Sequence, residues 1–142
     1  MIYFADMNHF RHCLLIDDDK DDCEIFSLTV AAIQEGVRMD AITEASEALA
    51  MLEGEGVAPD IIFLDLNMPK MNGLDCLRQI RQMEGLGRVP VIIYSTSTNP
   101  RDMEQARRDG ATDYLIKPVS IASLRQELSR IFEKYQLNNF AS

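Results

Sequence analysis

The sequence predicts an α/β protein with a five-stranded parallel sheet and helices on both faces. Apolar runs of roughly four to eight residues, bounded by turn signals, are typical of strands buried on both faces of such a sheet. The run IIFL at residues 61–64 is the clearest example. Between the runs lie segments with apolar residues at helical spacing, joined by short loops. This strict alternation is typical of a doubly wound sheet with crossover helices.

The first half of the chain predicts two strands, each followed by a helix. HCLLI at residues 12–16 is the first strand, and residues 20–35 carry a helical pattern with an acidic first turn, which suits the helix dipole. Gly36 ends that helix. Residues 39–45 are a weaker strand candidate. A short helix follows, with Ala45, Ala48, Leu49 and Leu52 on its apolar side. Gly54 and Gly56 close it.

The second half of the chain predicts three more strand and helix pairs. The strands are expected at residues 61–64, 89–95 and 113–116, and the helices at residues 74–83, 100–109 and 121–135. Asn99 caps the middle helix, Pro100 takes its first position, and Gly110 stops it. Ser120 caps the last helix.

One domain accounts for most of the chain. A length of 142 residues suffices to bury a single core. There is no internal repeat, no low-complexity tract and no linker. We expect the domain to span residues 11–137, with a loose N-terminal extension at residues 1–10 and a loose tail at residues 138–142.

Composition excludes several classes of protein. A net charge of −9 disfavours nucleic-acid binding, which depends on Lys and Arg at phosphates, and favours a cationic partner or a metal ion. No segment approaches the roughly 20 apolar residues needed to span a membrane. Cys13, Cys23 and Cys76 are odd in number and lie in apolar segments, so we interpret them as reduced core thiols of a cytoplasmic protein.

Polar residues follow four of the predicted strands. The carboxyl ends of parallel strands meet at the edge where open α/β folds bind ligands. The residues expected at this edge are Asp17, Asp18, Asp65, Ser95, Thr96 and Lys117. Three carboxylates and one ammonium leave a net charge of −2, which one divalent cation balances. Because the expected ligands are all oxygen atoms, the site favours Mg²⁺. Without a cation, at least one carboxyl pKa should be raised.

A metal ion beside an aspartate, with a lysine and a hydroxyl nearby, is suited to phosphoryl transfer onto that aspartate. Asp65 is therefore the candidate acceptor. Taken alone, Asp65 could instead cap a turn, Lys117 could be a surface lysine, and Tyr114 could be an ordinary core residue.

The motifs LLIDDD, FLDLNMPKMNG, YSTS and DYLIKP, in this order and spacing, resemble the receiver domain of two-component response regulators. The resemblance covers residues 12–135 and implies a flavodoxin-like strand order, 2-1-3-4-5. It further implies that Asp65 is the phosphorylated residue and that the metal is held by Asp17, Asp18, Asp65 and the carbonyl of Asn67. By the same resemblance, Ser95 is the switch hydroxyl and Lys117 is its cationic partner. Tyr114 is then the aromatic switch. Val119 departs from the Phe found in many members.

The resemblance also implies a cis peptide bond between Lys117 and Pro118. From the residues alone a trans bond is expected, because only about 5% of X–Pro bonds in folded proteins are cis.

The leading hypothesis is a phosphorylation-controlled receiver with Mg²⁺ as its cofactor. A histidine kinase or phosphotransfer protein would donate a phosphoryl group to Asp65, and the signal would pass by protein–protein contacts to a downstream target or through a homodimer. Such a module is not an enzyme beyond Mg²⁺-dependent self-phosphorylation and slow autodephosphorylation, and it binds neither nucleic acid nor membrane.

Two other functions compete with this hypothesis. An aspartate-nucleophile phosphohydrolase is disfavoured, because Asn67 replaces the second carboxylate of such enzymes and the chain has no room for a cap domain. A constitutive interaction module with a vestigial site is disfavoured, because every chemical position is filled.

The acidic run that begins at Asp17 does not fit a calcium-binding loop, since the sixth and twelfth positions of such a loop would be Asp22 and Leu28. We interpret Asp19, Asp21 and Asp22 as a solvated helix start.

Overall fold

The structure, a computed structural model, describes residues 11–54 and 58–141, and side chains as far as residue 136. The strands are β1 (His12–Ile16), β2 (Arg38–Ile42), β3 (Ile61–Leu64), β4 (Val91–Ser95) and β5 (Asp113–Ile116). The helices are α2 (Lys20–Ile33), α3 (Ala45–Gly54), α4 (Gly73–Gln82), α5 (Pro100–Arg108) and α6 (Ile121–Ala141). All strand pairs are parallel and their order is β2-β1-β3-β4-β5, which confirms the predicted fold class.

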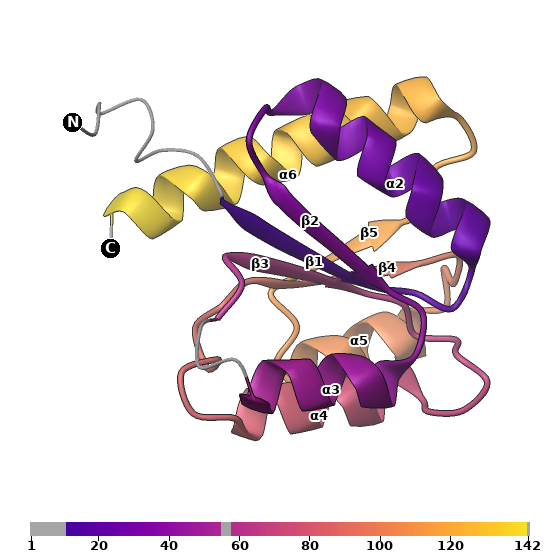
Figure 1. Ribbon diagram of the computed structural model, residues 1–142. Coiled ribbons are helices and arrows are strands. Elements are labelled where there is room, and N and C mark those ends of the chain that lie inside the picture. The colour runs from indigo at the N-terminus through magenta and orange to yellow at the C-terminus, as the bar shows by residue number, and fades with distance from the viewer. Residues whose placement is uncertain (1–10, 55–57, 142) are drawn as a thin grey trace.

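The molecule has three layers. Helices α2 and α6 cover one face of the sheet, and α3, α4 and α5 cover the other (Figure 1). Each crossover from one strand to the next therefore passes through a helix, as parallel connections require. All strands then end at the same edge.

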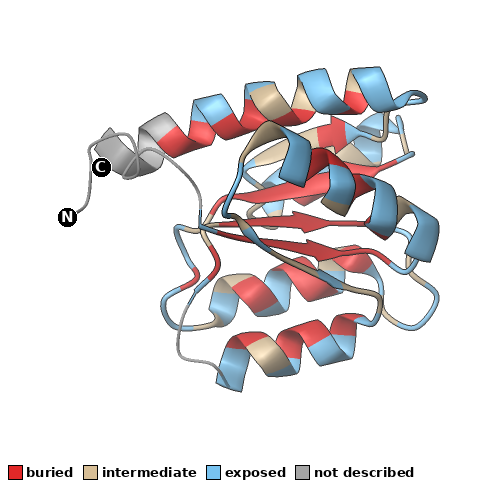
Figure 2. Ribbon diagram, turned by 45° about the horizontal axis from the view of Figure 1, so that its top comes forward, coloured by how far each residue is buried: buried red, intermediate tan, exposed pale blue. Residues whose placement is uncertain are grey.

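Two cores lie on the two faces of the sheet, because successive side chains of a strand point in opposite directions. Cys13 and Leu15 of β1 pack toward α2 and α6, while Leu14 and Ile16 pack toward α3 and α4. The central strands β1, β3 and β4 are buried throughout, as the red strands of Figure 2 show. This burial explains why their sequences are continuous apolar runs.

The three cysteines lie in these cores. Cys13, Cys23 and Cys76 are all buried and form no disulfide, which confirms their interpretation as core thiols. Burial raises the pKa of the Cys23 thiol to about 11 and that of Cys76 to about 12. They are therefore protonated at neutral pH and unreactive as nucleophiles.

Several element boundaries differ from the prediction. The strand expected at residues 89–95 begins only at Val91, because Pro90 has no N–H to donate and the Val89 N–H bonds back to Leu86 at 3.4 Å. The weak strand expected at residues 39–45 is β2, at Arg38–Ile42, and Ala45 belongs to α3 instead.

The C-terminal boundary is the largest difference. Helix α6 continues to Ala141, past residue 137, so the expected loose tail is helical as far as that residue. In Figure 1 the end of α6 projects beyond the sheet. The expected extension at residues 1–10 lies outside the described residues, and the domain limits stay a prediction.

Two further findings concern the backbone and the membrane. No cis peptide bond occurs in the described segments, so the Lys117–Pro118 bond is trans and the expectation taken from the resemblance is wrong. The trans form is the one that X–Pro bonds favour intrinsically, by about 0.5–1 kcal/mol. Within the same segments, no helix combines the length and the apolar character needed to cross a bilayer.

Candidate functional site

Backbone hydrogen bonds align the strand ends at the carboxyl edge of the sheet. The N–H of Asp65, directly after β3, donates to the carbonyl of Ile16 at 2.9 Å. The N–H of Lys117, directly after β5, donates to the carbonyl of Ser95 at 2.8 Å. Since Asp17 follows Ile16, these bonds bring Asp17 and Asp65 side by side at the centre of the sheet.

Three carboxylates form a cluster at this edge. Carboxylate oxygens of Asp17, Asp18 and Asp65 all lie within 4.8 Å of one another. Asp17 and Asp65 are buried, whereas Asp18 is exposed, so the cluster opens to solvent on the side of Asp18. The structure therefore gathers the three carboxylates that the sequence predicted to act together.

The side chain of Lys117 reaches into the cluster and is only 11% exposed. Its Nζ lies 2.8 Å from Oδ2 of Asp17 and 3.8 Å from Oδ2 of Asp65. The ring of Tyr94 lies on another side, with its centroid 5.3 Å from Nζ. The alternative of an ordinary surface lysine is thereby removed.

Burial and charge shift the pKa values of this group. The pKa of Asp65 is raised to about 6, first by burial and second by the charge of Asp17, while Lys117 opposes both. Burial also raises the pKa of Asp17. Burial would lower the pKa of Lys117, but its pairing with the carboxylates of Asp17 and Asp22 outweighs burial and raises that pKa above its ordinary value. The expectation of a raised carboxyl pKa is confirmed.

The donor set fits a divalent cation. Oδ1 of Asp17 accepts a hydrogen bond from the N–H of Asp19 at 3.0 Å. Oδ2 of Asp17 is buried and, despite its ion pair with Lys117, has no hydrogen-bond partner among the described residues. A buried carboxylate oxygen without a hydrogen bond, in a group of oxygen donors, suits Mg²⁺ or a related ion.

Two predicted residues lie at the margin of the cluster. Asn67 is exposed, and its N–H points toward Oδ1 of Asp65 at 3.4 Å. Thr96 is exposed directly after the buried Ser95. The role of the Asn67 carbonyl as a metal ligand and a catalytic part for Thr96 stay predictions.

Ser95 and Tyr114 are joined through the loop after β4. Oγ of the buried Ser95 accepts a hydrogen bond from the N–H of Ser97 at 3.1 Å. The hydroxyl of Tyr114, which is half-buried, donates to the carbonyl of Ser97 at 2.9 Å. Oγ of Ser97 in turn donates to Asp102 in the first turn of α5, at 2.6 Å. The loop thus links both predicted switch residues to α5, a connection through Asp102 that the sequence did not suggest.

The interpretation of Asp22 as a solvated residue is wrong. Nζ of Lys117 donates to Oδ2 of Asp22 at 2.8 Å, across 95 residues of sequence, and the Asp22 side chain is only 35% exposed. Asp22 is the third residue of α2, and the only signal in the sequence was its closeness along the chain to Asp17, which follows β1. With Asp22 the group holds four carboxylates and one ammonium, a charge of −3.

Local hydrogen bonds hold the acidic loop between β1 and α2. Asp19 is the N-cap of α2, and its Oδ1 accepts a hydrogen bond from the N–H of Asp22 at 3.0 Å. Sγ of Cys23 donates to the carbonyl of Asp17 at 3.2 Å. The cap orients the first turn of α2, so that Asp22 faces the cluster while Asp21 is exposed.

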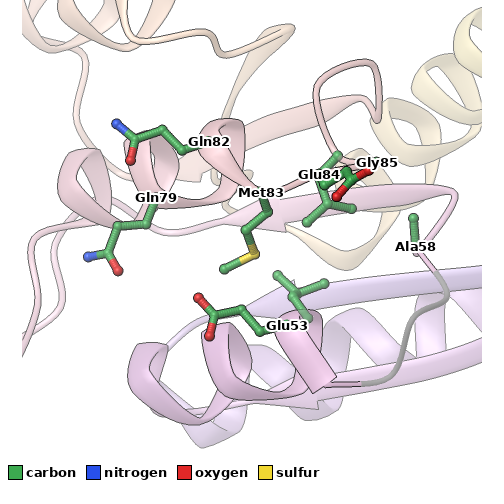
Figure 3. Close-up of a pocket in the computed structure, with 9 residues that line it drawn as sticks. Glu53, Ala58, Gln79, Gln82, Met83, Glu84 and Gly85 are labelled. Carbon is green, nitrogen blue, oxygen red and sulfur yellow. The ribbon is translucent and has the colours of Figure 1, made fainter.

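A pocket lies away from this site. It has a volume of about 780 Å³ and is lined by the carboxyl ends of α3 and α4, among them Glu53, Gln82 and Met83 (Figure 3). Ala58, which also lines it, precedes β3, so the pocket lies at the opposite edge of the sheet from Asp65. Chemistry, not pocket size, therefore identifies the candidate site.

Comparisons with known proteins agree with this geometry. The family model described as the response regulator receiver domain matches residues 13–129. The two-component response regulator ORR13 of Oryza sativa subsp. japonica is 33% identical over 120 residues, which cover 84% of this chain and 97% of the relative.

Solved structures point to the same class. The phosphorylated cyanobacterial phytochrome response regulator RcpA has a TM-score of 0.80 at 29% identity, covering 89% of this chain and 94% of that one. The Mn²⁺-bound response regulator Rcp1 has a TM-score of 0.76 at 27% identity, covering 85% and 91%. Fold and site thus define a regulatory α/β module of two-component signalling. The chain belongs to the response regulator receiver domain family.

Proposed function

We propose that this receiver accepts a phosphoryl group on Asp65 from a histidine kinase or phosphotransfer protein, with Mg²⁺ as its cofactor. The observation that carries the proposal is the placement of Asp65, whose Oδ2 lies 3.8 Å from the Lys117 ammonium, in a group with Asp17 and Asp18 within 4.8 Å. A carboxylate next to both a cation site and an ammonium is an activated nucleophile for phosphoryl transfer.

Each side chain has a role in this proposal. Asp17, Asp18 and Asp65, with the carbonyl of Asn67, would hold Mg²⁺, which when bound neutralises charge on the phosphoryl oxygens. Asp65 is the nucleophile, and the bond from phosphorus to the donor breaks as its oxygen attaches. Lys117 stabilises negative charge on the transferred group.

Two related solved structures support this chemistry. RcpA is described as phosphorylated and Rcp1 as Mn²⁺-bound, and both share the fold of this chain at more than 25% identity. Asp65 also has a pKa raised by burial to about 6, so it is ionised above that pH, as a nucleophile must be.

Phosphorylation would be transmitted through the loop after β4. Ser95 turns toward the phosphoryl group and gives up its bond with the Ser97 N–H, and the link from Ser97 to Tyr114 and Asp102 carries the change to α5. A local charge event then biases the surface formed by α5, β5 and α6. A downstream protein, or a second copy in a homodimer, would bind there, and the cytoplasm is the proposed location.

Phosphorylation of the purified chain tests the proposal. Incubation with a small phosphodonor and Mg²⁺ should add one phosphoryl group per chain, detected by intact mass, and Asp65→Asn should remain unmodified. An unmodified wild type, or equal modification of Asp65→Asn, would contradict the proposal and favour a vestigial site.

The same experiment separates a receiver from a phosphohydrolase. A receiver forms one aspartyl phosphate and loses it slowly, whereas an enzyme releases phosphate from small esters in steady turnover. Multiple turnovers at a rate proportional to enzyme concentration would favour the phosphohydrolase.

A further inference from the structure

The ammonium of Lys117 lies at the side of the carboxylate cluster, where it contacts an oxygen that a cation would also use. It lies 2.8 Å from Oδ2 of Asp17, the buried oxygen that has no hydrogen bond in the described structure. A divalent ion bound between Asp17 and Asp65 repels this ammonium, because the two positive charges would lie within a few ångströms of each other. Cation binding and the present position of Lys117 therefore compete.

Asp22 offers the ammonium a partner outside the cluster. Its Oδ2 accepts a hydrogen bond from Nζ at 2.8 Å, yet its carboxylate is not part of the group formed by Asp17, Asp18 and Asp65. Asp22 is supplied by α2, and the Asp19 cap holds its backbone. Lys117 can thus leave Asp17 without losing every charged partner.

We propose that Asp22 is a positioning residue, which holds the Lys117 ammonium at the side of the cluster and so leaves Asp17 and Asp65 accessible to a divalent cation. This inference rests on the proposed metal site. Without the Asp22 carboxylate, the ammonium moves toward the remaining partners, Asp17 and Asp65, and competes more strongly with the ion.

A simple charge effect predicts a different pattern. Any nearby carboxylate attracts a cation, whether or not it contacts Lys117. If Asp22 acts by positioning Lys117, its effect on Mg²⁺ affinity requires Lys117. If Asp22 acts only by attracting the cation, its effect does not require Lys117. A double-mutant cycle with Lys117 therefore separates the two explanations. Asp21→Asn is the matched control, because it removes one charge from the same turn of α2 at an exposed position.

The first measurement is the Mg²⁺ dissociation constant of the metal-free chain, by calorimetric titration. Asp22→Asn should weaken binding about tenfold, the scale of one charge-assisted hydrogen bond. Asp21→Asn should weaken it less than about twofold, because exposed charges are screened. In a Lys117→Gln background, Asp22→Asn should again have an effect below about twofold.

The second measurement follows Lys117 itself without a metal. The method is NMR of the chain with ¹³Cε-labelled lysine, and the spectrum is simple to assign because the chain has four lysines. The Lys117 signal should shift in metal-free Asp22→Asn and stay in place in Asp21→Asn, while unchanged signals from the other three lysines show that the fold is intact.

Two results would overturn the inference. One is equal Mg²⁺ affinity in Asp22→Asn and Asp21→Asn, and the other is an undiminished effect of Asp22→Asn when Lys117 is already Gln. A wild type that fails to bind Mg²⁺ would instead overturn the proposed metal site, which distinguishes the two failures.

Discussion

At the scale of single residues, the site is a set of buried charges that are only partly compensated. Asp65 is 5% exposed and its pKa is raised to about 6, with burial as the first cause and the charge of Asp17 as the second. Lys117 compensates part of this cost but is shared with Asp17 and Asp22. The metal-free fold therefore carries a destabilising carboxylate at its functional centre, as expected where stability is given up for reactivity.

Replacing Asp65 by Asn should stabilise the metal-free protein. The folded-state pKa of about 6 lies above the unfolded value of 3.8, so ionised Asp65 destabilises the fold above pH 6, by at most about 3 kcal/mol. The destabilisation declines as the pH falls from about 6 toward 3.8 and is absent well below 3.8, where the carboxyl is protonated in both states. Urea unfolding in the presence of a chelator checks this prediction. At pH 7.5 the free energy of unfolding of Asp65→Asn should exceed that of the wild type by about 1–3 kcal/mol. At pH 4 the two free energies should be much closer to each other. A stability difference that does not depend on pH would contradict this origin.

At the scale of elements, the start of α4 is packed directly against the end of β3. The N–H of Gly73 donates to the carbonyl of Leu66 at 2.9 Å. A Cβ at Gly73 would overlap the carbonyl oxygen of Asp65 and would lie 2.6 Å from Cα of Leu66. Asn72 caps the helix, and its side chain accepts a hydrogen bond from the N–H of Leu74 at 2.8 Å. The backbone of Asp65, the proposed phosphoryl acceptor, is thus in contact with a helix terminus that has no room for a side chain at position 73.

Gly73→Ala should therefore destabilise the protein and disturb the site. The new methyl group meets backbone, which cannot move aside as a flexible side chain can, so we expect a loss of about 2–3 kcal/mol in the free energy of unfolding. Mg²⁺ affinity should fall in the same variant, because the Asp65 backbone must shift.

The control is Gly54→Ala at the end of α3, where an added Cβ meets nothing within 4 Å. That change should be neutral or slightly stabilising, since alanine restricts the unfolded chain. Wild-type stability and Mg²⁺ affinity in Gly73→Ala would show that the contact is not tight.

At the scale of the whole molecule, parallel strand order turns separate sequence segments into one site. The order β2-β1-β3-β4-β5 places β1 and β3 at the centre, so Asp17 and Asp65 meet where the crossover connections reverse direction. The loops on this edge carry the residues of the site, and the strands beneath them are buried. A ligand at this edge bridges several strands at once, so its binding energy should stabilise the entire domain.

Mg²⁺ should accordingly raise the global stability of the chain. At a concentration of one hundred times its dissociation constant, a ligand that binds only the folded state contributes about 2.7 kcal/mol. Thermal or urea unfolding at pH 7.5 should show this gain in the wild type and in Asp21→Asn. In Asp18→Asn, which removes one carboxylate of the cluster, the gain at the same Mg²⁺ concentration should be much smaller. A full gain in Asp18→Asn would place the ion elsewhere.

The sequence predicted most of the architecture and the carboxylates of the cluster. Strands β1, β3 and β5 were found because runs of apolar residues end sharply at polar ones, and the caps Asn99 and Gly110 marked the limits of α5. The Asp17, Asp18 and Asp65 group followed from a topological rule, since parallel strands end at one edge.

Other features were missed because they depend on contacts between distant segments. The expected end of the last helix at residue 135 and the cis bond before Pro118 were wrong, and the link between Ser97 and Asp102 was not foreseen. Asp22 was the most consequential miss. Its neighbours in sequence indicate a solvated helix start, and its true partner lies 95 residues away.

Local periodicity and the order of residues along the chain define which segments become strands and helices and which residues stand at the strand ends, so these features can be read before folding. How the charges are shared depends on tertiary packing. The direction in which Asp22 and Lys117 point, and the burial that raises the pKa of Asp65, arise when α2, β3 and β5 pack together. The energy of a charge depends on its distance to other charges and to water, and folding sets both distances.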